Sequence, residues 1–185
     1  FATRVLSTFA GLIALALTYR LGTDLKSPRL GMIAAVLLGT SAFYLHYWHD
    51  VRDYTLYVLL TALSGWLYWR FLRRRWRATR REKTAFVLAL TGLFYVHYVA
   101  PVTYAALGAY HLLFAKRNAR WNGILFLFFV PLLLFAFWLP VTLIAATLQS
   151  GVSRSLPITD ILWWSLIGYG NGIGPLIVIA LGLAA

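Results

Sequence analysis

Cysteine is absent from this chain of 185 residues, and acidic residues are scarce, with only 5 Asp and Glu in total. The lack of cysteine excludes disulfides, thiol catalysis and cysteine-based metal sites within these residues. Charged residues make up 12% of the chain and hydrophobic residues 61%, whereas roughly 25% of the residues in a soluble domain are charged. This composition predicts an integral membrane protein.

Hydrophobic stretches recur along the whole chain, and several approach the ~20 residues that cross a hydrocarbon core. The predicted spans are Val5–Tyr19, Leu30–Tyr47, Tyr54–Phe71, Thr84–Val99, Val102–Ala115 and Trp121–Leu148. We therefore expect an all-α, polytopic transmembrane protein with six to seven spans, forming a single domain over residues 1–185. Because apolar stretches run up to both ends of the sequence, we expect a fragment of a longer protein.

Basic residues give the chain a formal net charge of +12, and they fall in alternate loops. Fourteen of the 17 Lys and Arg residues lie in three loops: three at Arg20, Lys26 and Arg29, eight between Arg70 and Lys83, and three at Lys116, Arg117 and Arg120. The positive-inside rule predicts that these loops, including the basic loop 72–83, are cytoplasmic. Loop 72–83 has the charge of a nucleic-acid-binding patch, but topology and anionic headgroups explain it better.

Two of the predicted spans, Thr84–Val99 and Val102–Ala115, are short for a membrane crossing. One long helix through both is the alternative. It would place Lys83 and Lys116 on opposite sides of the membrane, against the charge rule. A hairpin that breaks at Pro101 keeps both residues inside, and we favour it.

Two further irregularities are expected in the spans. The charge rule requires a turn between Tyr47 and Tyr54, although no glycine or proline marks its position. The stretch Trp121–Leu148 is longer than one crossing needs and contains Pro131 and Pro140. These prolines predict a tilted or kinked crossing rather than two spans.

The densest group of ionisable and aromatic side chains is His46–Tyr57, between two predicted spans. Burying Asp50, Arg52 or Asp53 at the bilayer centre would cost about 2.5 to 3.5 kcal/mol each, so we expect this segment at an interface or in a wet cavity. The charge rule predicts that it lies on the outer face, as does loop 149–160. One helix through the segment would align its polar residues on a single stripe.

A simpler interpretation of the same segment is also open. Its Tyr and Trp residues would form an interfacial belt, and Asp50 or Asp53 would cap the following helix. Both arrangements are common in membrane proteins, and they are compatible with a functional site.

The histidines divide into three cases. His46 and His49 have the spacing of some metal ligands, but without a third ligand nearby this is a weak signal. His97 lies at another outer end, where we expect a neutral, hydrogen-bonded side chain unless the fold brings it to Asp50. His111 is predicted to be a packing residue near the inner face.

Several short motifs follow one another in an order that is typical of one enzyme group. RVLS and TYRLG occur at 4–7 and 18–22, TSAFYLHYWHDVRDY at 40–54, VHYVAP at 96–101 and LPITDILWW at 156–164. Together they resemble the bacterial membrane glycosyltransferases of the GT-C superfamily, the group related to dolichyl-phosphate-mannose protein mannosyltransferases. Three positions depart from that pattern: Asp50 replaces Glu, Ala42 stands where Pro is usual, and Val96 replaces Thr.

The resemblance implies a multi-pass protein of the plasma (inner) membrane that transfers a sugar from a polyprenyl-phosphate carrier to an acceptor on the outer face. The implied catalytic residues are Asp50 and Arg52. Arg52 would bind the carrier phosphate, and Asp50 would orient it or hold a divalent metal ion. The implied substrate-binding residues are Tyr54, His97, Tyr98 and His49. The catalytic base of the family would lie in an outer loop upstream of Phe1.

A second function is consistent with the same motifs. The chain could be a non-catalytic transmembrane subunit that retains a GT-C-like fold inside a larger membrane complex. An upstream outer loop with acidic residues favours the enzyme, and a short apolar N-terminus favours the subunit. Both functions imply membrane lipid as a partner, and neither implies nucleic acid.

Overall fold

The computed structural model describes residues 2–48, 53–73, 78–118, 120–141 and 143–144. This part of the chain forms seven named helices: α1 (Ala2–Leu25), α2 (Pro28–Gly39), α3 (Ala42–Trp48), α4 (Tyr54–Leu72), α5 (Arg80–Val96), α6 (Ala100–Leu113) and α7 (Trp121–Ala136). No strand occurs among these residues, which confirms the predicted all-α class.

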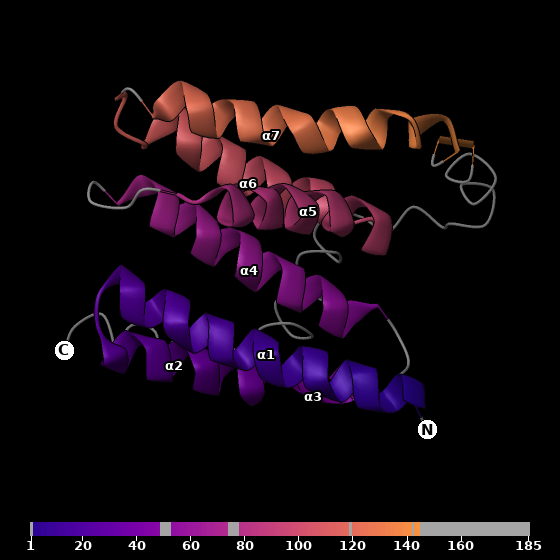
Figure 1. Ribbon diagram of the computed structural model, residues 1–185. Helices are drawn as coiled ribbons and strands as arrows, with labels where there is room; N and C mark the ends of the chain where they lie inside the picture. The colour runs from indigo at the N-terminus through magenta and orange to yellow at the C-terminus, as the bar shows by residue number, and fades with distance from the viewer. Residues whose placement is uncertain (1, 49–52, 74–77, 119, 142, 145–185) are drawn as a thin grey trace, which may run out of the picture.

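The long helices run back and forth between two ends of a bundle (Figure 1). One end holds the connections from α1 to α2, from α4 to α5 and from α6 to α7. We call it the basic end, because every Lys and Arg side chain that the structure describes lies at or near it: Arg20, Lys26, Arg29, Arg70, Arg73, Arg80, Arg81, Lys83, Lys116, Arg117 and Arg120. We call the opposite end, with the first turn of α4 and the α5–α6 turn, the aromatic end.

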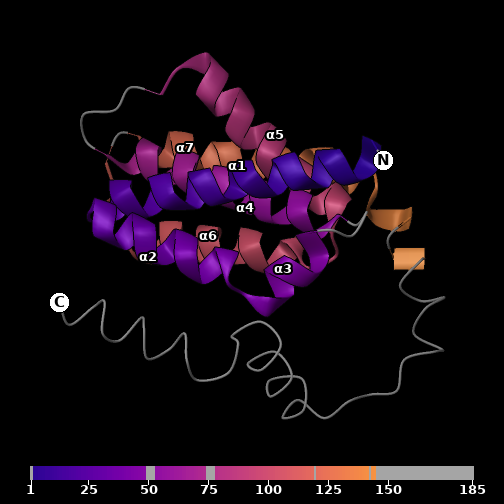
Figure 2. The same ribbon diagram turned by 90° about the horizontal axis from the view of Figure 1, so that it is seen from below.

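Helices α4, α5 and α7 surround the main core, and α5 is inclined to α1 and α4 (Figure 2). The ring of Phe86 on α5 meets Phe71 of α4 and Phe128 of α7 edge to face, with centroids 5.3 and 5.4 Å apart. Such pairs contribute roughly 0.5 to 1.5 kcal/mol beyond the burial of their area. These aromatic contacts join helices that are distant in sequence.

Helices α1 and α2 pack with their backbones in unusually close approach. A Cβ atom on Gly22 would lie 2.7 Å from the Gly31 Cα atom, and one on Gly31 would collide with the Tyr19 carbonyl oxygen and the Thr23 hydroxyl. Small residues permit this kind of helix contact, which is common between membrane helices. Glycine is therefore required at both positions.

Side-chain caps define where two of the helices begin. The Ser27 hydroxyl accepts a hydrogen bond from the Leu30 N–H at 3.3 Å, and Pro28 occupies the first turn of α2. At α5, Thr79 and Glu82 form a capping box, with the Thr79 N–H donating to the Glu82 carboxylate at 2.9 Å. These caps satisfy backbone N–H groups that have no partner within the helix.

Large apolar side chains cover much of the outside of the bundle. Leu133 on α7 is 77% exposed and Phe9 on α1 is 60% exposed, and similar side chains are exposed on α2 and α6. By length and apolar composition, one described helix, Val5–Leu25, is able to cross a membrane, while Pro28–Gly39 and Trp121–Ala136 are apolar but shorter.

The span predicted at Leu30–Tyr47 is wrong as a single helix, because α2 ends at Gly39 and α3 begins at Ala42. At this break the N–H and the hydroxyl of Thr40 both donate to the Val36 carbonyl oxygen, at 2.9 and 2.7 Å. A threonine hydroxyl bonded back to the helix competes with the next backbone hydrogen bond. Helix α2 ends at Gly39 with Thr40 bonded back in this way, although the same back-bond by Thr18 and Ser64 leaves α1 and α4 continuous.

The predicted hairpin between α5 and α6 is confirmed, but its break is not at Pro101. The chain turns at residues 97–99, and Pro101 lies in the first turn of α6. A proline there costs little, because the N–H that it lacks would have no helical partner.

The predicted interruption in Trp121–Leu148 is also observed in the described part. The chain forms a turn at Phe137 and Trp138, and it is helical again at residues 139–141. The break lies just before Pro140, whereas Pro131 is accommodated inside α7.

Candidate functional site

The aromatic end brings together residues from two motifs that are far apart in sequence. The His97 ring lies between Tyr54 and Tyr57 of α4, with centroids 4.9 and 5.2 Å away, and Tyr98 stacks on it at 4.3 Å. His97 is only 7% exposed, whereas Tyr98 is 84% exposed. Three of the predicted substrate-binding residues, Tyr54, His97 and Tyr98, are therefore neighbours.

Backbone geometry fixes the orientation of His97. The residue ends α5 in an extended conformation, with its N–H bonded to the Leu93 carbonyl oxygen at 3.1 Å. The Val99 N–H donates to His97 Nδ1 at 3.1 Å. Since Nδ1 accepts, the proton of the neutral imidazole is on Nε2. The prediction that His97 is a hydrogen-bonded histidine is confirmed, and its Nε2–H can donate to a ligand oxygen.

Tyr57 is held by a second contact, between its hydroxyl and the Thr103 hydroxyl of α6 at 2.6 Å. This bond joins the first turns of α4 and α6, next to His97. It fixes the tyrosine ring against the imidazole. The site therefore combines aromatic faces with hydrogen-bond donors, a chemistry suited to a ligand rich in hydroxyl or phosphate oxygens.

The remaining predicted site residues are in a different position. His49, Asp50 and Arg52 lie outside the described residues, so the predicted polar stripe over His46–Tyr57 lies partly outside them as well. Asp53 immediately precedes α4 but makes no capping hydrogen bond with its side chain, so the simple cap predicted for it is wrong. Its αR backbone angles differ from the extended conformation typical of a cap.

No group of three possible metal ligands occurs among the residues that the structure describes. The predicted metal ligand, Asp50, is not one of them.

A polar network that the sequence did not predict lies at the basic end, around Asp24. The Trp66 indole N–H donates to the Asp24 carboxylate at 3.0 Å, and the Trp69 N–H donates to the Asp24 carbonyl oxygen at 2.9 Å. Arg20 and Arg73 approach the carboxylate at 3.6 and 3.9 Å. The only sequence signal was an acidic residue in a loop of cations, because the tryptophans come from another span.

Glu82 organises a second network at the same end. Beyond its capping bonds to Thr79, its carboxylate lies 3.3 Å from the Arg70 guanidinium. The guanidinium also lies 4.5 Å above the centre of the Trp66 ring. The networks of Asp24 and Glu82 thus meet at Trp66.

His111 is buried in the same half of the bundle and is fully bonded. Its Nδ1 lies 3.1 Å from the Tyr68 hydroxyl, and its Nε2 lies 3.1 Å from the Trp121 carbonyl oxygen. The ring also stacks on Trp121 at 5.0 Å. The prediction of a packing histidine is confirmed.

Comparisons with known proteins do not assign the chain to a family. No family model, curated protein or solved structure matches this chain.

Proposed function

We propose that the chain is part of a multi-pass membrane glycosyltransferase, similar to the GT-C superfamily, that acts at the aromatic end. It transfers a sugar from a polyprenyl-phosphate carrier to an acceptor on the outer face. The observation that carries the proposal is the contact between Tyr54 and His97. Each belongs to a different motif that resembles one of the superfamily, and the two side chains are neighbours at one site.

The multi-pass topology is supported by where polar and apolar groups lie. The described cations are confined to one end of the bundle, while large apolar side chains are exposed along its helices. Exposed apolar surface of this extent marks a membrane or protein contact. The 21 residues Val5–Leu25 of α1 are long and apolar enough to cross a membrane, and they extend over roughly 32 Å, close to the ~30 Å of a hydrocarbon core.

Each site residue has a definite role in this proposal. Arg52 neutralises the carrier phosphate through charge-assisted hydrogen bonds, and Asp50 orients Arg52. His97 donates from Nε2 to an oxygen of the donor substrate, because its Nδ1 is occupied by the Val99 N–H. The exposed ring of Tyr98 offers an aromatic face to the sugar of the donor.

The test is sugar transfer by the full-length chain, measured at matched expression. Arg52→Ala should lower transfer by about a hundredfold, the loss typical of a donor that stabilises developing charge. Arg52→Lys should recover part of it, since lysine supplies a charge without the bidentate fork. Arg29→Ala removes an equivalent charge at the basic end and should leave transfer unchanged.

Two further variants separate catalysis from packing. His97→Phe keeps the ring but loses both nitrogens, so it should lower transfer about tenfold while the protein stays folded. Asp50→Asn should be nearly as damaging as Arg52→Ala. Near-normal transfer in both Asp50→Asn and Arg52→Ala would reject the catalytic site and favour a non-catalytic subunit.

A further inference from the structure

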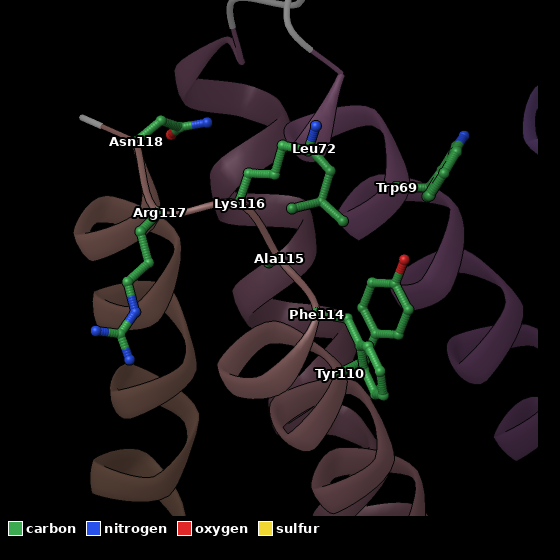
Figure 3. A pocket seen from close by; sticks show the side chains of 8 residues that line it. All are labelled: Trp69, Leu72, Tyr110, Phe114, Ala115, Lys116, Arg117 and Asn118. Atoms are coloured by element: carbon green, nitrogen blue, oxygen red, sulfur yellow. The ribbon is translucent and has the colours of Figure 1, made fainter.

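A second concave site lies at the basic end, away from His97. It is a pocket of ≈ 470 Å³ between the end of α4, the last turn of α6 and the loop that leads to α7 (Figure 3). This volume falls within the roughly 300 to 1,000 Å³ of small-ligand sites. The motifs discussed above do not include its lining residues.

One half of the pocket is apolar and aromatic. Leu72, Tyr110 and Phe114 line it, and the Tyr110 and Phe114 rings lie 5.6 Å apart. Phe114 is 71% exposed, although it lies at the end where the described cations gather. The Trp69 indole N–H is engaged by Asp24, so this residue contributes its ring rather than its polar group.

The other half of the pocket carries a cation. Figure 3 shows the Lys116 side chain extending toward Leu72, while the Tyr110 hydroxyl is directed toward the side of the pocket where Trp69 lies. Arg117 follows Lys116 in sequence but points away along α7, with its guanidinium 5.5 Å from the centre of the Trp121 ring. Among the described lining residues, Lys116 is therefore the cation whose charged group extends across the pocket.

The carboxylates at this end do not neutralise Lys116. Asp24 is near Arg20 and Arg73, and Glu82 is near Arg70. No ion pair of Lys116 occurs within the described part of the chain. A ligand with an anionic head and an apolar body would match both halves of the pocket.

We infer that this pocket binds an anionic phospholipid of the cytoplasmic leaflet. Its phosphodiester meets Lys116 and the Tyr110 hydroxyl, and its acyl chains lie against Phe114. Basic pockets between membrane helices on the cytoplasmic side are suited to such headgroups. The inference rests on the membrane topology within the proposed function, and it is independent of sugar transfer.

The test is lipid retention by the full-length chain. The protein is reconstituted in nanodiscs of equal phosphatidylglycerol and phosphatidylcholine, extracted into neutral detergent, and its bound lipids are counted by native mass spectrometry. The wild type should retain more phosphatidylglycerol than phosphatidylcholine. Lys116→Gln should lower the ratio of the two retained lipids about fivefold, the effect of one basic residue near an anionic surface.

Matched variants decide whether the effect belongs to the pocket. Lys26→Gln removes an exposed lysine from the same end and should leave the lipid ratio unchanged. Lys116→Arg should preserve the ratio of the two retained lipids. Tyr110→Phe should lower this ratio less than Lys116→Gln does. Unfolding temperatures in phosphatidylcholine alone should agree among these variants, which separates ligand binding from folding.

Three results would overturn the inference: no preference for phosphatidylglycerol in the wild type, no effect of Lys116→Gln, or an equal loss in Lys26→Gln. Displacement of the lipid by millimolar glycerol 3-phosphate would instead assign the pocket to a soluble anion. Failure of sugar transfer alone would leave the lipid ratio unchanged, so the two proposals fail separately.

Discussion

The two ends of the bundle hold their polar groups in different ways. At the basic end, α4 supplies Trp66 to the Asp24 carboxylate and Arg70 to the Glu82 carboxylate, and Glu82 also bonds to Thr79 at the start of its own helix. At the aromatic end, His97 is held by rings and by one backbone N–H. Within the described part of the chain its Nε2 has no hydrogen-bond partner.

At one end the acidic groups stabilise the fold, and at the other a donor is left to bind a ligand. Acidic groups at the basic end are used in holding α1, α4 and α5 together, while cations such as Lys116 stay available to anions. At the aromatic end, His97 keeps a donor in a fixed orientation. A fixed donor that is not used by the fold is what a binding site requires.

The largest effect on stability is expected where the backbones of α1 and α2 are in close contact. Gly31→Ala adds a Cβ that meets the Tyr19 carbonyl oxygen and Thr23, so it should destabilise the fold by about 3 kcal/mol. Gly108→Ala makes the same change on α6, where nothing lies within 4 Å. It should be neutral or stabilising. Thermal unfolding in one detergent compares them, and equal unfolding temperatures would contradict the close approach.

A smaller effect is expected from the acidic residues at the two ends. Asp24→Ala leaves the Trp66 N–H without an acceptor and should cost about 2 kcal/mol. Asp24→Asn keeps an acceptor oxygen and should cost less, because the exposed arginines add little. Asp53→Ala at the aromatic end removes no capping bond and should change stability by less than about 0.5 kcal/mol.

Chemical denaturation gives the free energy of unfolding of these three variants, and the differences from the wild type rank the contributions of the two residues to stability. If Asn at position 24 is as damaging as Ala, the charge of Asp24 matters more than its hydrogen bond. If Asp53→Ala costs as much as Asp24→Ala, the two ends are not distinct.

An effect smaller than that of Asp24→Ala is expected at the aromatic end, for the bond between the Tyr57 and Thr103 hydroxyls. Tyr57→Phe removes one hydroxyl and should cost about 1 kcal/mol. Thr103→Val removes the other, and the double variant should cost clearly less than the sum of the two. Full additivity in this cycle would show that the hydroxyls do not interact.

The sequence was sufficient for features with a local physical cause. Apolar runs predicted helices, and alternate basic loops predicted the common end at which Lys26, Arg73 and Lys116 now lie. The same loop charges predicted that His46–Tyr57 and His97 share one end, where Tyr54 and His97 are in contact. Hydropathy is averaged over a span, so it could not locate the break between α2 and α3 at Thr40 and Ser41.

Features that depend on distant partners could not be predicted. Nothing in the local sequence of Asp24 points to Trp66, which belongs to another helix. The collision that makes glycine necessary at Gly31 exists only once α1 and α2 are in contact. The position of Pro101 was misjudged because proline both ends helices and begins them.

The central claim is that the two ends lie on opposite sides of a membrane, with the site on the outside. The chain has no cysteine, so single variants can be labelled directly with an impermeant thiol reagent in intact cells. His49→Cys should be modified from outside, and Ala78→Cys should react only after the membrane is opened. Modification of Ala78→Cys from outside with protection of His49→Cys would contradict the topology and the site proposed with it.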